Sequence, residues 1–233
     1  MIPNKAKPAN EVFDYLNFIF KVMTENQSFL LNSDKGKETC DEVIELCNDA
    51  IDQAFYFVKR EDNISEYVRF AMASFTFHVL MPQSNAIYAN LLLGNIVACF
   101  NELRLMTESL AICYWADLKF PKQSFFQEKF QLLEEERKEK SISKYLRDLD
   151  KEAITLWGQL SQEWVHTKGI MDRLVTEITG KSEVPAWALT VPIAYTPGDV
   201  DTVDELGRKV SQFRALLKAT VDRWKGNILK DQR

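Results

Sequence analysis

Two histidines, His78 and His166, are the only imidazoles in the chain, so histidine chemistry has few places to occur. His166 follows Glu163 by three residues in SQEWVHTKG, and residues three apart share one face of a helix. Ferritin-like di-metal sites need two such E-x-x-H units and two further glutamates. The sequence contains no second unit, and it therefore predicts no metal site and no cofactor. His78 falls on an apolar stripe with Ala71 and Phe75, which favours a histidine in the core or at its edge.

A second polar group interrupts an otherwise apolar segment. Asn101, Arg104 and Glu108 are spaced to lie on one helical face, and Arg104 can pair with Glu108 four residues later. One interpretation is an internal salt bridge that fixes how the helix packs. The other is a polar pocket, in which the Arg104 guanidinium binds a small anionic ligand.

Catalysis would require these residues to meet the histidine. If the segment around Arg104 packed against residues 151–166, then Arg104, Glu108, Glu163 and His166 would converge. A histidine that moves protons and an arginine that stabilises negative charge are suited to cleaving a phosphodiester. The candidate catalytic residues are Arg104, Glu163 and His166, and the candidate binding residues are Asn101, Arg104, Glu108 and Trp187.

The same pattern carries a resemblance. A long helix with R-x-x-x-E, followed by a later helix with a serine and a histidine a few residues apart, resembles a set of prokaryotic all-helical proteins over residues 90–170. Some of these are distantly similar to the HEPN superfamily, which implies a ribonuclease or nucleotide-binding protein of a toxin or abortive-infection type. HEPN nucleases carry an arginine four to six residues before the motif histidine. No arginine stands at those places before His166, so no catalytic residue is carried over.

Charge limits the partners. The 233-residue chain has a net charge of −5, which disfavours nucleic acid and anionic membrane surfaces and leaves a local basic patch as the one route to nucleic acid. The densest basic stretch, 137–151, is interleaved with acidic residues and predicts a solvated helix face. No secretory or membrane-spanning segment is apparent, and the four cysteines lack a C-x-x-C spacing. We expect a cytoplasmic protein with reduced cysteines.

Few helix breakers occur, with 8 glycines and 7 prolines. Apolar residues recur at helical spacing, which predicts an all-α bundle of six or seven helices in a single domain, 1–233. The expected helices are 9–31, 36–59, 64–80, 83–118, 123–149, 151–179 and 202–228. The helix 83–118 is apolar nearly all round, which predicts a central position.

Two of these helices show clear apolar stripes. In 36–59 the stripe predicts one buried face and consists of Cys40, Val43, Ile44, Cys47, Ala50, Ile51, Ala54, Phe55 and Val58. In 202–228 it consists of Leu206, Val210, Phe213, Leu217 and Trp224. Thr202 and Glu205 have the spacing of a capping box at the start of this last helix.

Residues 181–200 contain three prolines and several large apolar residues, including Trp187. We expect this loop to lie across the bundle as an ordered strap, which closes the core, lines a pocket mouth or forms a dimer contact. The sequence as a whole favours a non-enzymatic helical binding or regulatory protein, as a possible homodimer, with a protein partner or a small anionic ligand. The alternative is a HEPN-like ribonuclease or nucleotide-binding protein.

Overall fold

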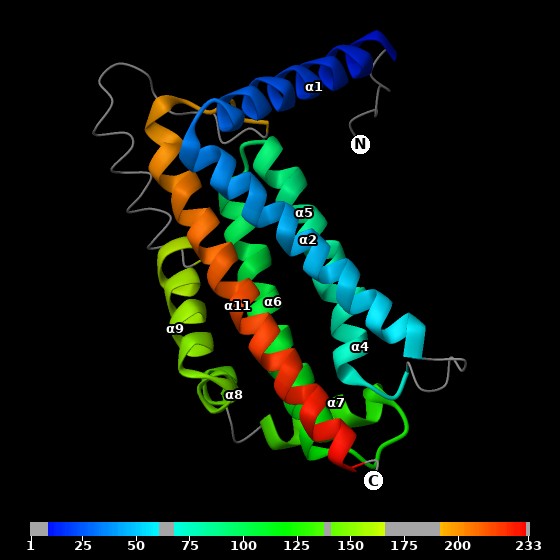
Figure 1. The fold of residues 1–233 in the computed structure, drawn as a ribbon. Helices are drawn as coiled ribbons and strands as arrows, with labels where there is room; N and C mark the ends of the chain where they lie inside the picture. The colour runs from blue at the N-terminus through cyan, green and yellow to red at the C-terminus, as the bar shows by residue number, and fades with distance from the viewer. Residues whose placement is uncertain (1–8, 61–67, 138–140, 166–191, 232–233) are drawn as a thin grey trace, which may run out of the picture.

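The computed structural model describes residues 9–60, 68–137, 141–165 and 192–231, and every regular element in these ranges is helical (Figure 1). The expected all-α fold is confirmed. The α-helices are α1 (Ala9–Leu31), α2 (Asp34–Arg60), α4 (Ala71–Phe75), α5 (Met81–Leu92), α6 (Ile96–Lys119), α7 (Phe126–Arg137), α8 (Ile142–Leu149), α9 (Lys151–Leu160) and α11 (Val200–Asp231). Two π-helical turns, Thr76–Leu80 and Ser161–Val165, and a 3-10 turn, Pro197–Asp199, complete them.

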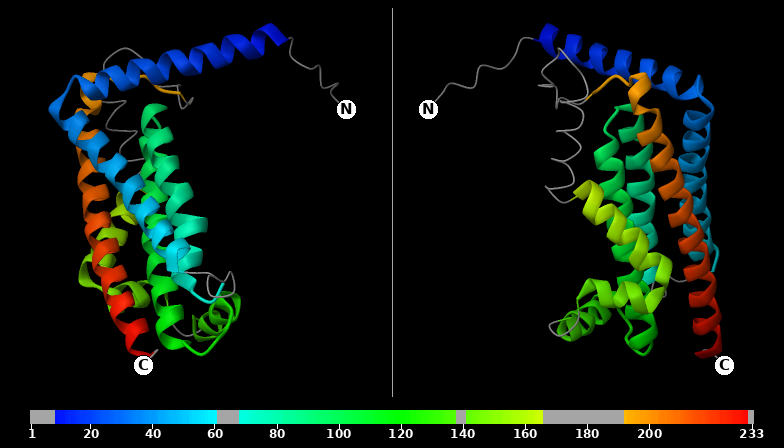
Figure 2. Two further views of the ribbon diagram at one scale, coloured as in Figure 1. Left: turned by 45° about the vertical axis from the view of Figure 1, so that its right-hand side comes forward. Right: turned by 90° about the vertical axis from the view of Figure 1, so that its left-hand side faces the viewer.

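The bundle is built around α6. Helices α5, α9 and α11 pack against it, and α2 packs against both α5 and α11. The shorter α7 and α8 cover the lower end of α6 in Figure 1. Helix α1 is different, because it runs crosswise over the upper end and continues beyond the other helices, as all three views show (Figures 1 and 2).

The expected helix 83–118 is wrong in one respect, because the chain turns at Leu93–Asn95 and forms two helices, α5 and α6. Gly94 adopts a φ of 72°, a left-handed conformation that side chains disfavour. The Asn95 side chain then accepts a hydrogen bond from the Ala98 amide and begins α6. This turn lay hidden in the sequence because leucines precede it and apolar residues follow it.

Three other boundaries also differ. The expected helix 123–149 is divided into α7 and α8, and Ser141 is the residue before α8. The capping box at Thr202 and Glu205 is wrong, because Thr196 and Asp199 form the box and α11 already begins at Val200. Helix α4 begins at Ala71, while residues 64–67 of the expected helix 64–80 lie outside the described residues, as does 166–179 of 151–179.

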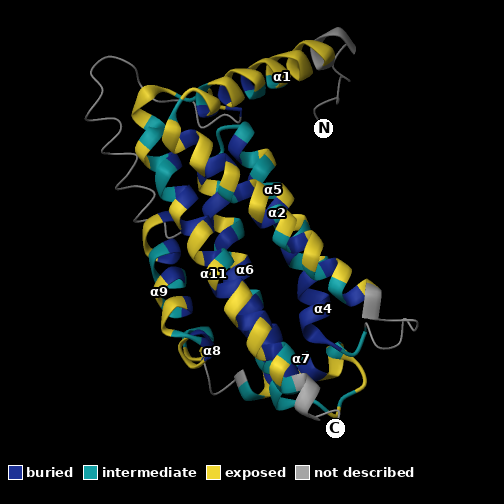
Figure 3. Cartoon of the chain, viewed as in Figure 1, coloured by how far each residue is buried: buried dark blue, intermediate teal, exposed yellow. Residues whose placement is uncertain are grey.

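The two predicted apolar stripes differ in burial (Figure 3). The stripe of α11 is buried throughout, as expected. The single buried face of α2 is a wrong prediction, because only part of it reaches the core. Cys40, Val43, Ala50 and Ala54 are buried, whereas Ile44, Ile51, Phe55 and Val58 are exposed by 44%, 44%, 53% and 62%. The helices that pack on α2 therefore cover only part of its apolar face.

The described end of the expected strap, residues 192–196, crosses the end of the bundle. The Ile193 amide donates to the Leu93 carbonyl at 2.9 Å. The fully buried Asn26 of α1 donates to the carbonyls of Leu92 and Ile193, each at 2.8 Å, and accepts from the Tyr195 amide at 2.8 Å. One asparagine thus joins α1, the α5–α6 turn and the strap. Residues 181–191, with Trp187, lie outside the described residues.

Candidate functional site

The polar group on α6 forms an ion pair. The Arg104 Nη2 lies 3.0 Å from the Glu108 Oε1, and the Trp157 Nε1 of α9 donates to the same oxygen at 2.6 Å. The Arg104 guanidinium also lies 5.8 Å from the centre of the Trp157 ring, within the range of a cation–π contact. Both ends of the pair are about three-quarters buried. The carboxylate already occupies the guanidinium, which fits a link between α6 and α9 better than an open anion site.

Two other candidates lie within the described residues, and both are exposed. Asn101 is exposed on α6, and Glu163 is exposed on the π-helical turn that follows α9. His166 and Trp187 lie outside the described residues, so the convergence of Arg104 with His166 stays a prediction. His78 is exposed on the first π-helical turn, which places it at the edge of the bundle and not in its core.

The most buried ionic group was missed by the sequence analysis. Asp117 of α6 is fully buried, and its carboxylate lies 2.7 Å from the Nζ of the equally buried Lys129 of α7. It also accepts from the backbone amides of Ala71 and Met72 at 2.9 and 3.1 Å, and from the Trp224 Nε1 at 2.9 Å. The carboxylate caps α4 and ties four helices together. A lone Asp in the apolar run YWADLKF is the sequence signal that could have revealed it.

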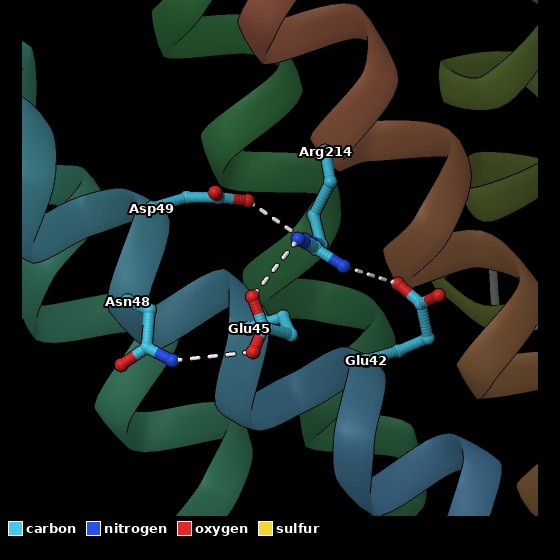
Figure 4. Close-up of polar contacts among 5 residues, drawn as sticks. All are labelled: Glu42, Glu45, Asn48, Asp49 and Arg214. Atoms are coloured by element: carbon cyan, nitrogen blue, oxygen red, sulfur yellow. Dashed lines mark hydrogen bonds and ion pairs between the residues drawn. The ribbon is translucent and has the colours of Figure 1, made fainter.

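A second charged group joins the two longest helices of the bundle. Figure 4 shows Arg214 of α11 reaching toward Glu42, Glu45 and Asp49 on α2. Its Nε lies 2.7 Å from Asp49, its Nη1 2.8 Å from Glu42 and its Nη2 3.5 Å from Glu45. Three carboxylates thus face one guanidinium, and open hollows of about 390 and 490 Å³ lie on either side of it. The carboxylates act as an interhelical clamp and leave this groove acidic.

A hollow of about 300 Å³ between α4, α6 and α7 is lined in part by Cys113, whose sulfur is a strong nucleophile when it is ionised. The Cys113 thiol lies against it, beside Phe75 and Phe130. Burial raises the pKa of this thiol well above its usual value, with a smaller contribution from Asp117. A thiol held protonated is a poor nucleophile. The hollow therefore offers an apolar surface and no activated group.

The most unusual feature of the described surface is a set of exposed large apolar side chains on α1 and α2. We call the first half of α1 the arm, after its exposed residues Phe13, Leu16, Phe18 and Phe20, and we call Ile44, Ile51 and Val58 the α2 stripe. The arm residues are exposed by 64%, 41%, 50% and 63%. Exposed large apolar side chains in such number commonly mark an interaction site.

One arm residue, Phe18, continues a face that is buried further along α1. Val22, Asn26 and Leu30, spaced four apart, pack on the end of the bundle and are 4%, 0% and 0% exposed. Phe18 precedes Val22 by four residues and lies on the same side of the helix, but it is half exposed. The helix therefore extends past the bundle while its apolar face continues.

Comparison with known proteins adds no neighbour, because no family model, no curated protein and no solved structure matches the chain. In the described ranges, none of the helices combines the length and apolar character that crossing a membrane requires. Those ranges also hold no group of three or more His, Cys, Asp or Glu residues placed to bind a metal ion. The geometry alone must carry the functional argument.

Proposed function

We propose that the chain is a non-enzymatic helical binding protein that acts through the arm and the α2 stripe. The observation that carries this proposal is the exposure of large apolar side chains on two neighbouring helices, 41–64% on the arm and 44–62% on the stripe. Each such side chain in water forgoes on the order of 1.5–3 kcal/mol when it could be fully buried. A partner surface that covers them would recover part of that free energy.

The chemistry-bearing groups of the described residues support the same proposal. Asp117 accepts four hydrogen bonds and is sealed from solvent. Arg104 is paired with Glu108, and Arg214 is held by three carboxylates. Groups that are already neutralised have little left to offer a substrate. These contacts serve the packing of helices, and the apolar surface remains as the feature that packing does not explain.

Site-specific photo-crosslinking in cells tests the proposal. A benzophenone amino acid at Phe18 should yield one discrete crosslinked species, whose partner is identified by peptide mapping. The matched control places the same amino acid at Gln212, an exposed polar position of α11 away from the arm. Equal and diffuse crosslinking at both positions, or none at Phe18, would contradict an arm that binds a protein.

The alternative, a HEPN-like ribonuclease using Arg104, Glu163 and His166, is tested separately. We expect the purified chain to leave a fluorogenic single-stranded RNA intact over hours. Hydrolysis that disappears in both Arg104→Ala and His166→Ala, while both variants keep the wild-type melting temperature, would replace the binding proposal with the nuclease.

A further inference from the structure

We infer that the partner is a second copy of this chain, and that the two copies exchange arms, each arm lying on the α2 stripe of the other. This inference rests on the proposed function, because it names the occupant of the same surface. It commits to a closed, two-fold symmetric dimer with two identical contacts.

Within one chain the two apolar surfaces do not meet. The turn at Asn32 and Ser33 separates α1 from α2, and the buried side of α1 fixes it crosswise on the end of the bundle (Figure 2). Helix α1 extends beyond the bundle, whereas helix α2, whose stripe residues are exposed, runs down the side of the bundle. Both surfaces stay exposed in the single chain, so the arm requires the surface of another molecule.

The spacing on both surfaces suits contact between helices. Ile44, Ile51 and Val58 follow one another at intervals of seven residues. Phe13, Leu16 and Phe20 follow one another at intervals of three and four. Both are spacings of the seam along which two helices pack as knobs into holes. At about 1.5 Å per residue, the stripe extends roughly 20 Å and is longer than the arm that it would receive.

The area is sufficient for a specific dimer. An open aromatic side chain offers on the order of 150–250 Å², so the exposed fractions of the arm and stripe leave roughly 600 Å² on each chain. Two reciprocal contacts together bury roughly 1,200 Å², which reaches the lower limit of specific interfaces. A single contact would bury only about half of that, so a dimer held by one arm should be much weaker than one held by two.

Charge disfavours an anionic membrane, and symmetry favours a second copy. Helix α1 carries Glu11, Asp14 and Glu25 against Lys21, and anionic lipid would repel the resulting net charge of −2. Identical chains bring one arm and one stripe each, so a two-fold pair covers all four surfaces and leaves none open. A partner that covered the arm alone would leave the stripe in water.

Molecular mass measured by light scattering or sedimentation is the first test. Wild-type protein should show twice the 27.0 kDa of one chain at concentrations of about 100 µM, and it should dissociate on dilution. Hydrogen exchange in the arm and in the α2 stripe should slow together as the dimer forms. A wild-type chain that stays monomeric overturns the inference, and if it is then found on vesicles containing phosphatidylglycerol, the surface is a membrane contact.

Variants test the two halves of the contact. Phe13→Ser with Phe20→Ser, and Ile44→Ser with Ile51→Ser, should each give monomers with unchanged helical circular dichroism, since all four side chains are exposed. The matched control, Asp14→Ser with Asn17→Ser on the polar side of the arm, should remain dimeric. Dimers that persist in either apolar variant contradict the inference.

Mixing distinguishes arm exchange from pairing of arm with arm. The arm variant retains an intact stripe and the stripe variant retains an intact arm, so the mixture regains one of the two contacts. We expect heterodimers that are weaker than wild type by at least tenfold but detectable. No heterodimer at the highest soluble concentration overturns the exchange. Pairing of arm with arm would instead leave the stripe variant dimeric on its own, because its arm is intact. A monomeric chain whose Phe18 still crosslinks to a different protein overturns the dimer alone and leaves the proposed function in place.

Discussion

Helices α11 and α1 are both long and amphipathic, yet they differ in what covers their apolar faces. The five predicted stripe residues of α11 are each 2% exposed or less, whereas the four arm residues of α1 are 41–64% exposed. Helix α11 lies along α2 and α6, and α1 crosses the end of the bundle and extends beyond it. Apolar periodicity shows that a face will be covered, but it does not show whether the cover comes from the same chain.

A matched pair of aspartates tests that difference most strongly. Val210→Asp places a lone charge in the core and should cost about 4 kcal/mol or more of unfolding free energy, enough to prevent folding. Ile51→Asp places the same group on the α2 stripe, where the side chain is 44% exposed, and should change the melting temperature of the monomer little. Thermal denaturation at low concentration compares the two. Equal losses would show that α2 is as buried as α11.

Removing the α6 carboxylate that binds Trp224 of α11 should have the next largest effect. Asp117→Ala leaves the buried Lys129 ammonium without its partner and should cost about 3–5 kcal/mol in chemical denaturation. The double variant Asp117→Leu with Lys129→Met removes both charges and should recover much of this loss. A loss below about 1 kcal/mol in the single variant would contradict a carboxylate that anchors α11.

Gly94→Ala tests the turn on which the crosswise position of α1 depends. The new Cβ would approach the Ile193 carbonyl oxygen to 2.0 Å in a backbone with φ of +72°. We expect a loss of about 1–3 kcal/mol in denaturation. Gly158→Ala in α9, whose Cβ would meet no atom within 4 Å, is the control and should be neutral or stabilising by up to about 1 kcal/mol. An unchanged free energy of unfolding in Gly94→Ala would show that the close approach of the Ile193 carbonyl to Gly94 does not contribute to stability.

Of these predictions, Arg214→Met should lower the free energy of unfolding least. Its three carboxylate partners are all partly exposed, so the loss should be about 1 kcal/mol or less and should shrink in high salt. Arg208→Met, which breaks an exposed pair with Asp204, should be close to neutral by urea denaturation. A loss above about 3 kcal/mol that is insensitive to salt would show that the clamp is effectively buried.

The sequence predicted the fold class and the α11 stripe because both follow from helical periodicity. It placed Ile51 in the core because the apolar face of α2 is continuous. How much of that face α5 and α11 cover depends on tertiary packing, which the periodicity of α2 does not show. It missed the turn at Gly94 because the strap that requires a glycine there is distant in the chain. Long-range geometry of this kind has no local signal.

The candidate site was predictable only in part. The pairing of Arg104 with Glu108 was predicted correctly because the two residues are four positions apart on one helix. Trp157, which completes the group, comes from a distant segment and could not be paired by spacing. The Asp117 cluster was missed for the same reason, since its four donors come from three other parts of the chain.

The contacts of Asn26 have a consequence for the order of events during synthesis. Its side chain bonds to residues 66 and 167 positions later in the chain. At about 5–20 residues per second, the ribosome needs roughly ten to thirty seconds to supply the second partner after Asn26 has emerged. Helix α1 is therefore synthesised before both partners of Asn26, and it completes these contacts only after the strap has emerged. During that interval its phenylalanines are in reach of chaperones or of a neighbouring nascent chain on the same messenger.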